Sequence, residues 1–334
     1  IYDLTIKELE DYFISINEKK FRAVQVYEAL YKRRVTSFDD MTNISKEVRE
    51  KLKQDFSFYK IKMLVKQQGK NVNKYLFELE DGNKIESVLM FHDYGTSICV
   101  SSQVGCNMTC AFCESGRLKK VRNLLAYEIV QQILQIEEDI NKRITHVVVM
   151  GIGEPFDNYD NVLRFVKIIN CGKGIDIGSR HITISTCGVI PGIKKFMNEE
   201  GQVNLAISLH APNNTLRSRI MPINKAYPLN ELMETIKEYI NKTNRRVTFE
   251  YIMLDNVNDS EENAKELAAL LKEINCYVNL IPYNETENIE FKRTKEWKIM
   301  KFYDILKKNK INVTIRKEFG GSVDAACGQL RANN

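Results

Sequence analysis

Three cysteines on one short loop carry the clearest chemical signal in this chain of 334 residues. Cys106, Cys110 and Cys113 follow the spacing C-x3-C-x2-C, and no fourth cysteine lies nearby at a ligand spacing. Three thiolates can bind three irons of a [4Fe-4S] cluster and leave the fourth iron open to a small ligand. Zinc loops usually carry paired Cys-x2-Cys or Cys/His groups, and no histidine flanks this loop. The spacing therefore favours a cluster over zinc or three incidental buried cysteines.

Further chemical groups follow other apolar runs of the sequence. Gly151-Ile152-Gly153-Glu154-Pro155 combines glycines, which let a ligand approach the backbone, with a carboxylate that can accept from an ammonium group. Ser185, Ser208, His210 and Asn284 follow later runs and could bind a ribose, a carboxylate or a base edge. Each of these groups alone is more often part of an ordinary turn or cap. Their shared position after successive strands indicates a common site.

Alternating strand and helix patterns would bring these groups to one edge of a sheet. From residue 97 onward, six βα units predict a parallel sheet buried on both faces. Six units are too few for a closed eight-stranded barrel, and active sites in such folds lie at the C-terminal ends of the strands. The apolar runs are 97–100, 146–150, 181–185, 203–209, 247–254 and 277–282, with helices such as 127–138, 160–169, 229–241 and 261–274 between them and a last strand at 313–315.

Two smaller units precede this region. Residues 1–55 contain three helical patterns, and Thr5 with Glu8 predicts a capping box for the first. Residues 56–96 carry short β patterns, with a hairpin signal at Asp81-Gly82. We therefore predict an α/β fold: a partial (βα)6 barrel with a small N-terminal helical module and a short antiparallel β-extension. The predicted domains are 1–55, 56–96, 97–290 for the barrel and 291–334 for a C-terminal segment.

Composition narrows the class of protein. Hydrophobic residues make up 43% of the chain, which is enough for a buried core. No apolar run approaches the roughly 20 residues that span a bilayer, and the first residues do not resemble a signal peptide. Eight cysteines without an export signal favour reduced thiols over a disulfide scaffold. We expect a cytoplasmic monomer that does not contact a membrane.

Four stretches together resemble the RlmN/Cfr family of radical S-adenosylmethionine (SAM) RNA methyltransferases. The resemblance covers essentially the whole chain, including residues 1–55. It implies a radical SAM barrel with one [4Fe-4S] cluster on Cys106, Cys110 and Cys113, and SAM at the open iron. The stretches are 99–106, 151–155, 206–212 and 324–330.

The resemblance also implies roles for individual residues. Cys327 would carry a methyl group, Cys99 would be its redox partner, and Glu86 would accept a proton. By its own pattern, a cysteine in a glycine-rich tail could be inert. The other three cysteines match no family function, and we interpret them as structural. SAM-binding roles carry over to Gly153, Glu154, Ser185, Ser208, Leu209, His210 and Asn284.

The chemistry implied by the resemblance explains why so unusual a site is needed. The amidine carbon of adenine is electrophilic and cannot simply attack a sulfonium methyl group. In the family's scheme, one SAM methylates the Cys327 thiolate, and reductive cleavage of a second SAM gives a radical that activates this methyl group. The activated carbon adds to adenine. Attack by Cys99 on the Cys327 sulfur then releases the RNA and leaves a disulfide.

The implied partners are 23S rRNA, tRNA and an electron donor such as flavodoxin with its reductase. The net charge is only +5, and any single basic cluster is more often a solvated face. The cluster at 117–122 directly follows the cysteine loop and is best placed to meet phosphates. The module at 1–55 is a candidate for docking RNA, or it only supports the barrel. The basic clusters are 19–22, 32–34, 117–122, 245–246 and 316–317.

Several alternatives stay open at this point. Val104 and Pro155 resemble the RlmN type, which methylates carbon 2 of a 23S rRNA adenosine and adenosine 37 of some tRNAs. The Cfr type methylates carbon 8 of the same rRNA adenosine and gives antibiotic resistance. An iron–sulfur or zinc protein that binds RNA without catalysis, or a radical SAM enzyme for a small molecule, would also need the cysteines. The chain departs from the family at 114–116 and at Cys187, which leaves the cluster, carrier and SAM positions intact.

Overall fold

One ten-stranded sheet runs through the part of the chain that the computed structural model describes, residues 1–316. Its strand order is β1-β2-β3-β4-β7-β8-β9-β10-β11-β12. Neighbours are antiparallel from β1 to β4 and parallel from β4 to β12. The strands are β1 (Lys62–Gly69), β2 (Val72–Glu78), β3 (Lys84–His92), β4 (Gly95–Val100), β7 (His146–Val149), β8 (Ile182–Thr186), β9 (Asn204–Ser208), β10 (Val247–Met253), β11 (Cys276–Pro282) and β12 (Val313–Ile315).

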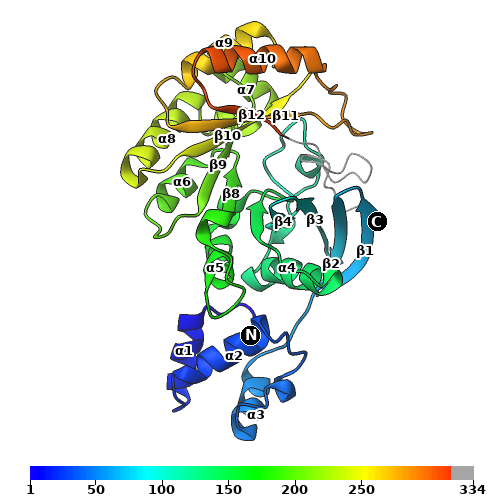
Figure 1. Cartoon of the computed structure of the whole chain (residues 1–334), viewed down its shortest axis with the longest axis vertical. Helices are drawn as coiled ribbons and strands as arrows, with labels where there is room; N and C mark the ends of the chain where they lie inside the picture. The colour runs from blue at the N-terminus through cyan, green and yellow to red at the C-terminus, as the bar shows by residue number, and fades with distance from the viewer. Residues whose placement is uncertain (317–334) are drawn as a thin grey trace.

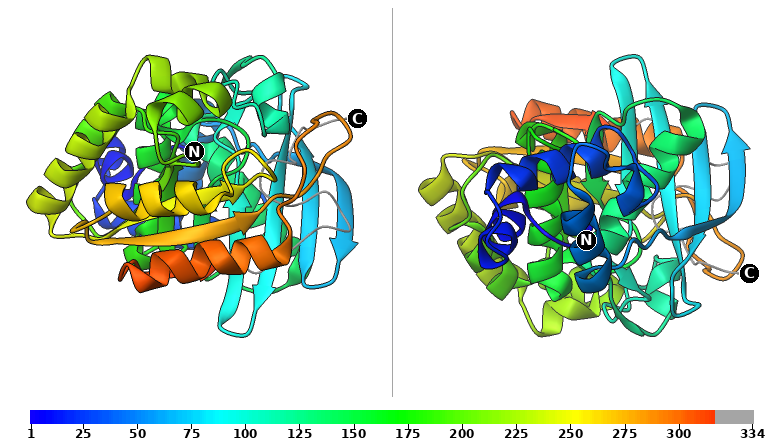
Figure 2. Two further views of the ribbon diagram at one scale, coloured as in Figure 1. Left: turned by 90° about the horizontal axis from the view of Figure 1, so that it is seen from above. Right: turned by 90° about the horizontal axis from the view of Figure 1, so that it is seen from below.

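The parallel strands and their crossover helices confirm the predicted partial barrel. The order ends on β1 and β12 and does not close into a ring within the described residues. Helices lie around the outside of the curved sheet (Figure 2) and bury its outer face. The inner face is less buried than predicted, because Val148, Thr248 and Asn279 are half-buried and line a cavity. The helices are α4 (Ala126–Ile140), α5 (Tyr159–Asn170), α6 (Ile190–Phe196), α7 (Asn214–Ile220), α8 (Leu229–Thr243), α9 (Glu261–Leu270) and α10 (Glu296–Lys308), with short 3-10 turns η1 (Phe38–Asp40), η2 (Glu114–Arg117), η3 (Pro155–Asn158), η4 (Ser179–His181) and η5 (Pro222–Lys225).

The helix expected at 261–274 is shorter than predicted. It ends at Leu270, and Glu273 has a φ of 68°, a left-handed conformation that an α-helix does not continue through.

The antiparallel extension continues the barrel sheet instead of forming a sheet of its own. The predicted hairpin joins β2 and β3, and Gly82 takes a φ of +81° in its turn. β3 then pairs with β4, where Val88 lies opposite Cys99. Side chains two residues apart on a strand share a face, so Glu86 and Cys99 both point to the face that carries Val88.

The N-terminal helices α1 (Ile6–Ser15), α2 (Phe21–Tyr31) and α3 (Lys46–Asp55) lie at one end of the molecule (Figure 1). The predicted capping box on Thr5 and Glu8 starts α1. The module is joined to α4, where the backbone N–H of Tyr127 donates to Asp3 Oδ1 at 3.0 Å, and to α5, where Arg164 pairs with Glu8 at 3.0 Å. The division of the chain into four domains stays a prediction.

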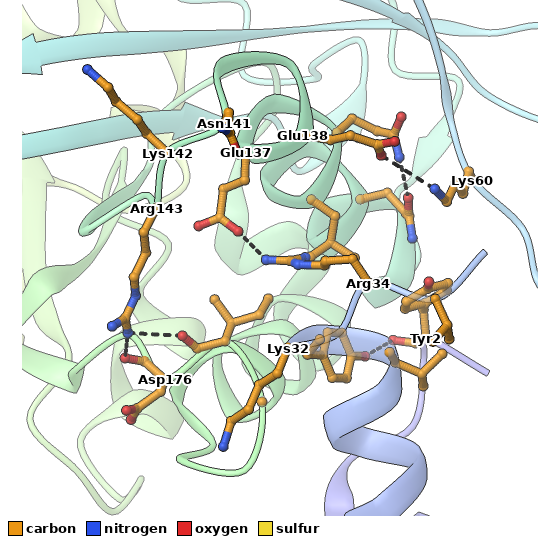
Figure 3. Close-up of a pocket in the computed structure, with 18 residues that line it drawn as sticks. Tyr2, Lys32, Arg34, Lys60, Glu137, Glu138, Asn141, Lys142, Arg143 and Asp176 are labelled. Atoms are coloured by element: carbon orange, nitrogen blue, oxygen red, sulfur yellow. Dashed lines mark hydrogen bonds and ion pairs between the residues drawn. The ribbon is translucent and has the colours of Figure 1, made fainter. Parts of the chain in front are cut away.

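A cavity of about 630 Å³ lies between this module and the barrel (Figure 3). Several of its charged side chains are engaged with neighbouring groups: Arg34 with Glu137, Lys60 with Glu138 at 3.4 Å, and Arg143 with backbone carbonyls. None of its lining residues lines the cavity of the cysteine loop described below. We therefore treat it as part of the junction. In the described part of the chain, every helix is too short or too polar to cross a membrane.

Candidate active site

The cysteine loop is closed at its base by a two-stranded antiparallel sheet. β5 (Gln103–Val104) precedes the loop and β6 (Arg122–Asn123) follows it. Within the loop, the backbone N–H of Cys106 donates to the carbonyl of Leu118 at 3.1 Å. The N–H of Ala111 donates to the carbonyl of Ile220 at the end of α7, at 2.9 Å. These bonds fix the loop against the C-terminal edge of the barrel.

Cys106, Cys110 and Cys113 line one cavity of about 140 Å³. Phe112, Met221, Ile252 and Ile281 add apolar surface to the same cavity. Burial raises the pKa of Cys106 to about 12 and the pKa of Cys110 well above its ordinary value. Metal binding to such thiols must release their protons.

Three thiols on one loop that line one cavity fit the donor set of a cluster whose irons each take one cysteine. Within residues 1–316, no group of three or more His, Cys, Asp or Glu side chains is arranged to hold a single metal ion.

The glycine turn after β7 packs so tightly that only glycine fits. Gly153 has a φ of +110°, and a Cβ there would lie 2.6 Å from the Cβ of Gln103. A Cβ on Gly151 would lie 2.7 Å from the carbonyl oxygen of Val100. The side-chain oxygen of Gln103 accepts from the backbone N–H of Glu154 at 2.9 Å. The close approach therefore places Glu154 at the cavity.

Glu154 presents a buried carboxylate to this cavity. Its Oε1 accepts from the N–H of Phe156 at 3.0 Å, and its Oε2 accepts from the N–H of Cys187 at 2.8 Å. Burial raises the pKa of Glu154, although both hydrogen bonds act in the opposite direction. A buried carboxylate oriented in this way is suited to accept from a ligand's ammonium group.

His210 is held as a neutral donor at the same cavity. Its Nδ1 accepts from the backbone N–H of Ile252 at 3.0 Å, so the ring proton lies on Nε2. Burial, with a smaller effect from Arg217, lowers the pKa of His210 to about 3. The ring meets Phe112 edge-on, with 4.8 Å between centroids. His210 can therefore donate one hydrogen bond at any physiological pH.

The structure brings five of the seven predicted SAM-binding residues to the cavity of the three cysteines. Leu209 does not line it, because its side chain is fully buried and its N–H donates to the carbonyl of Glu250 at 3.0 Å. Asn284 follows β11 outside the lining set. The five lining residues are Gly153, Glu154, Ser185, Ser208 and His210.

The predicted catalytic residues Glu86 and Cys99 lie on neighbouring strands and do not line this cavity. Glu86 forms a buried ion pair with Lys74 at 3.0 Å. Ser101 links the two regions, since its hydroxyl donates to the carbonyl of Glu86 at 2.6 Å and accepts from the N–H of Ile152 at 3.0 Å. Cys327 lies outside the described residues. No disulfide joins two of the described cysteines.

The predicted phosphate site at 117–122 is partly occupied by internal ion pairs. Lys120 binds Asp157 at 2.7 Å, and Arg122 binds Glu128 at 2.8 Å. On the other side of the cysteine loop, a cavity of about 570 Å³ carries further cations from three segments of the chain. Its basic lining residues are Arg117, Arg219 and Lys292, beside Thr109, Cys110 and Gly116.

Sequence reasoning missed two buried charged residues. Arg217 is fully buried on α7, and its guanidinium donates to the carbonyls that end β8 and β9. Glu250 lines both the cysteine cavity and a cavity of about 820 Å³ inside the barrel. Its Oε1 accepts from Asn279 at 3.0 Å, while its Oε2 has no hydrogen-bond partner in residues 1–316. A glutamate inside the apolar run 247–254 was the available signal for Glu250.

Comparison with known proteins finds similar families and relatives along the chain. Residues 1–57 match the ribosomal RNA large subunit methyltransferase N-terminal domain, and residues 100–268 match the radical SAM superfamily. The protein named probable dual-specificity RNA methyltransferase RlmN of Spiroplasma citri is 54% identical, covering 100% of this chain and 97% of that protein. The protein of the same name from Enterococcus faecalis is 55% identical, with 99% and 96% covered.

Solved structures agree with these relatives. A radical SAM methyltransferase from Sphaerobacter thermophilus is 41% identical, with a TM-score of 0.94 over 100% of this chain and 99% of that one. SuiB of Streptococcus suis bound to S-adenosylmethionine shares the fold alone, with 16% identity and a TM-score of 0.51 over 68% of this chain and 51% of its own. The chain therefore belongs to the RlmN family of radical SAM RNA methyltransferases.

Proposed function

We propose that this chain methylates carbon 2 of an adenosine in the peptidyl-transferase centre of 23S rRNA and of adenosine 37 in tRNAs. The observation that carries the proposal is the meeting of three cysteines, Glu154 and His210 at one buried cavity. Relatives at 54% and 55% identity bear the name of dual-specificity RNA methyltransferase. Val104 and Pro155, at the loop base and the glycine turn, match the RlmN type. We place the enzyme in the cytoplasm, with a flavodoxin-type electron donor.

Cys106, Cys110 and Cys113 would hold the [4Fe-4S] cluster, which supplies the electron for reductive cleavage of SAM when bound. Glu154 would accept a hydrogen bond from the ammonium group of SAM, while Gly153 lets that group approach the backbone. His210 would donate from Nε2 to an acceptor of the same ligand. The apolar walls keep water away from these groups, which strengthens each polar contact.

We assign the methyl carrier to Cys327, whose thiolate would take a methyl group from SAM by displacement. After the carrier carbon has joined the base, Glu86 would accept the proton from the adenine ring. The sulfur of Cys99 would then attack the sulfur of Cys327, breaking the bond to the product carbon and forming a disulfide. Two observations support placing Glu86 and Cys99 at one site. The two residues share a face of the sheet, and Ser101 links Glu86 to the glycine turn.

We place the RNA backbone at the cavity lined by Arg117, Arg219 and Lys292. These cations lie beside the cysteine loop, and phosphates are bound by such groups. Lys292 pairs with Glu285 at 2.9 Å and Arg117 donates to the carbonyl of Asn288, so a phosphate would compete with these contacts. A target adenosine would have to leave its stack to reach the cavity behind the loop.

The proposal is tested by locating the methyl group in RNA. Anaerobically reconstituted enzyme, SAM, dithionite and either 23S rRNA or tRNA transcripts are incubated together, and the digested nucleosides are separated by mass spectrometry against 2-methyl- and 8-methyladenosine standards. We expect 2-methyladenosine from both RNAs. Finding 8-methyladenosine alone would refute the assignment to carbon 2. Formation of 5′-deoxyadenosine without any methylated nucleoside would refute RNA as the substrate.

A further inference from the structure

Arg217 is a fully buried cation surrounded by neutral hydrogen-bond acceptors. Its Nη2 donates to the carbonyls of Cys187 at 2.6 Å and Ser208 at 3.3 Å, and its Nε donates to the carbonyl of Leu209 at 3.3 Å. Its Nη1 donates to the side-chain oxygen of Asn224 at 3.1 Å. These bonds hold together the C-terminal ends of β8 and β9, which carry predicted SAM-binding residues.

The position of Arg217 is unusual because an unpaired buried charge is costly. The hydrogen-bond acceptors around Arg217 are three backbone carbonyls and one amide oxygen, and no carboxylate of residues 1–316 forms an ion pair with it. The neutral carbonyls offset part of the desolvation, but they do not balance the charge. The site therefore lacks a negative partner for Arg217 within residues 1–316.

The cysteine loop is the place where such a partner would lie. Cys110 and Cys187 line the same cavity, and α7, which carries Arg217, accepts a hydrogen bond from Ala111 of that loop at its last residue. A [4Fe-4S] core held by three thiolates has a net negative charge, which grows when the core takes up one electron.

We propose that Arg217 is a positioning residue with a second, electrostatic role: it fixes the ends of β8 and β9 and supplies the buried positive charge that favours the reduced cluster. This inference rests on the cluster proposed above. The electron comes from a one-electron donor of the flavoprotein class, or from dithionite in the assay. Loss of the charge disfavours reduction, so the midpoint potential of the cluster moves to more negative values.

Three variants separate the charge from the hydrogen bonds. Arg217→Gln removes the charge and most of the bonds. Arg217→Lys keeps the charge with fewer bonds. Asn224→Asp leaves Arg217 itself unchanged and places a carboxylate at the position that already accepts from Nη1 at 3.1 Å, while it gives up the Nδ2 hydrogen bonds to Asn214 and Ser218. Arg246→Gln is the control, because it removes the same formal charge from an exposed position just before β10, where solvent screens it and where it lines neither cavity of the cysteine loop.

The experiment is a redox titration of each reconstituted protein with dithionite and mediators, followed by electron paramagnetic resonance, together with SAM binding by calorimetry. We expect more negative midpoint potentials in Arg217→Gln and Asn224→Asp, and potentials near that of the parent chain in Arg217→Lys and Arg246→Gln. Loss of two or more hydrogen bonds should raise the Kd for SAM at least about tenfold in Arg217→Gln, whereas Asn224→Asp should stay within about threefold of the parent chain.

The outcomes distinguish the inference from the proposal beneath it. Equal potentials in the parent chain and Asn224→Asp would overturn the electrostatic role, and this variant decides the question if Arg217→Gln does not fold. A midpoint potential shifted as far by Arg246→Gln as by Asn224→Asp would overturn the special role of the buried charge. Failure of the parent chain itself to assemble a cluster would instead refute the cluster assignment.

Discussion

Replacing Gly153 with alanine tests the tight turn that places Glu154. The added Cβ would lie 2.6 Å from the Cβ of Gln103, a separation that real Cβ atoms do not reach, and the backbone φ of +110° is one that alanine rarely adopts. Gln103 is fully buried and is bonded to Asn123 and Asp157, each at 2.9 Å. Gln103 cannot move aside without breaking these bonds. The substitution therefore costs stability in two ways, through crowding against Gln103 and through backbone strain.

Two other glycines serve as controls that separate backbone strain from crowding. Gly201 has the same φ of +110° but no atom within 4 Å of its Cβ position, and Gly178 has ordinary φ and equally open space. Backbone strain costs about 1–3 kcal/mol and overpacking a further 1–3 kcal/mol. Gly153→Ala should therefore lose about 2–6 kcal/mol of unfolding free energy and Gly201→Ala about 1–3 kcal/mol. Gly178→Ala should stay within about 0.5 kcal/mol of the parent chain.

The assay is urea unfolding of the three apo-proteins, with SAM binding to the reconstituted forms measured by calorimetry. SAM affinity should fall in Gly153→Ala alone, because Gln103 accepts from the backbone N–H of Glu154. Equal losses of stability in Gly153→Ala and Gly201→Ala would refute the crowding by Gln103. Unchanged SAM affinity in Gly153→Ala would refute the link from this turn to the SAM site.

Three further predictions follow from the site. Glu154→Gln should raise the Kd for SAM about 10- to 150-fold, since a charge-assisted hydrogen bond contributes about 1.5–3 kcal/mol, and an unchanged Kd in calorimetry would exclude Glu154 as the ammonium acceptor. His210 has a folded-state pKa lowered to about 3, so its contribution to stability is present above the unfolded pKa near 6.5 and is lost as pH falls. Urea unfolding at pH 7 and pH 5 should show the parent chain losing about 2 kcal/mol more than His210→Gln, and identical losses would contradict a neutral buried ring. Cys327→Ala should abolish RNA methylation while keeping the cluster spectrum, and Cys99→Ala should trap an RNA–protein crosslink on denaturing gels; normal release of methylated RNA by either variant would refute the role given to that cysteine.

Much of the site could be predicted because parallel strands end at a common edge. Cys106, Glu154, Ser185 and His210 are far apart in sequence, yet each lies at or just after the C-terminal end of a strand, and strand order alone brings them to one cavity. The same reasoning does not resolve which residues near a strand end face the cavity. Leu209 is adjacent to two lining residues but is directed into the core, which is a matter of side-chain direction.

Residues that act through burial could not be predicted from spacing. Arg217 lies on a seven-residue helix between Leu216 and Ser218, where an arginine ordinarily indicates a solvated face. Only tertiary packing shows that its donors reach Cys187 and Leu209. The internal pairing of Lys120 with Asp157 also depends on a contact 37 residues apart in sequence. The pattern of charged residues in a sequence predicts the sign of the charge on a surface. It does not predict which group pairs with each charged residue.

The most direct test of the central claim is the metal content of the cysteine loop. Iron, acid-labile sulfide and zinc are measured in anaerobically reconstituted protein, beside a variant in which Cys106, Cys110 and Cys113 are all alanine. We predict about four irons and four sulfides per chain in the parent protein and none in the variant, as expected for one cubane on three thiolates. Stoichiometric zinc in the parent chain, or iron retained by the triple variant, would contradict the assignment.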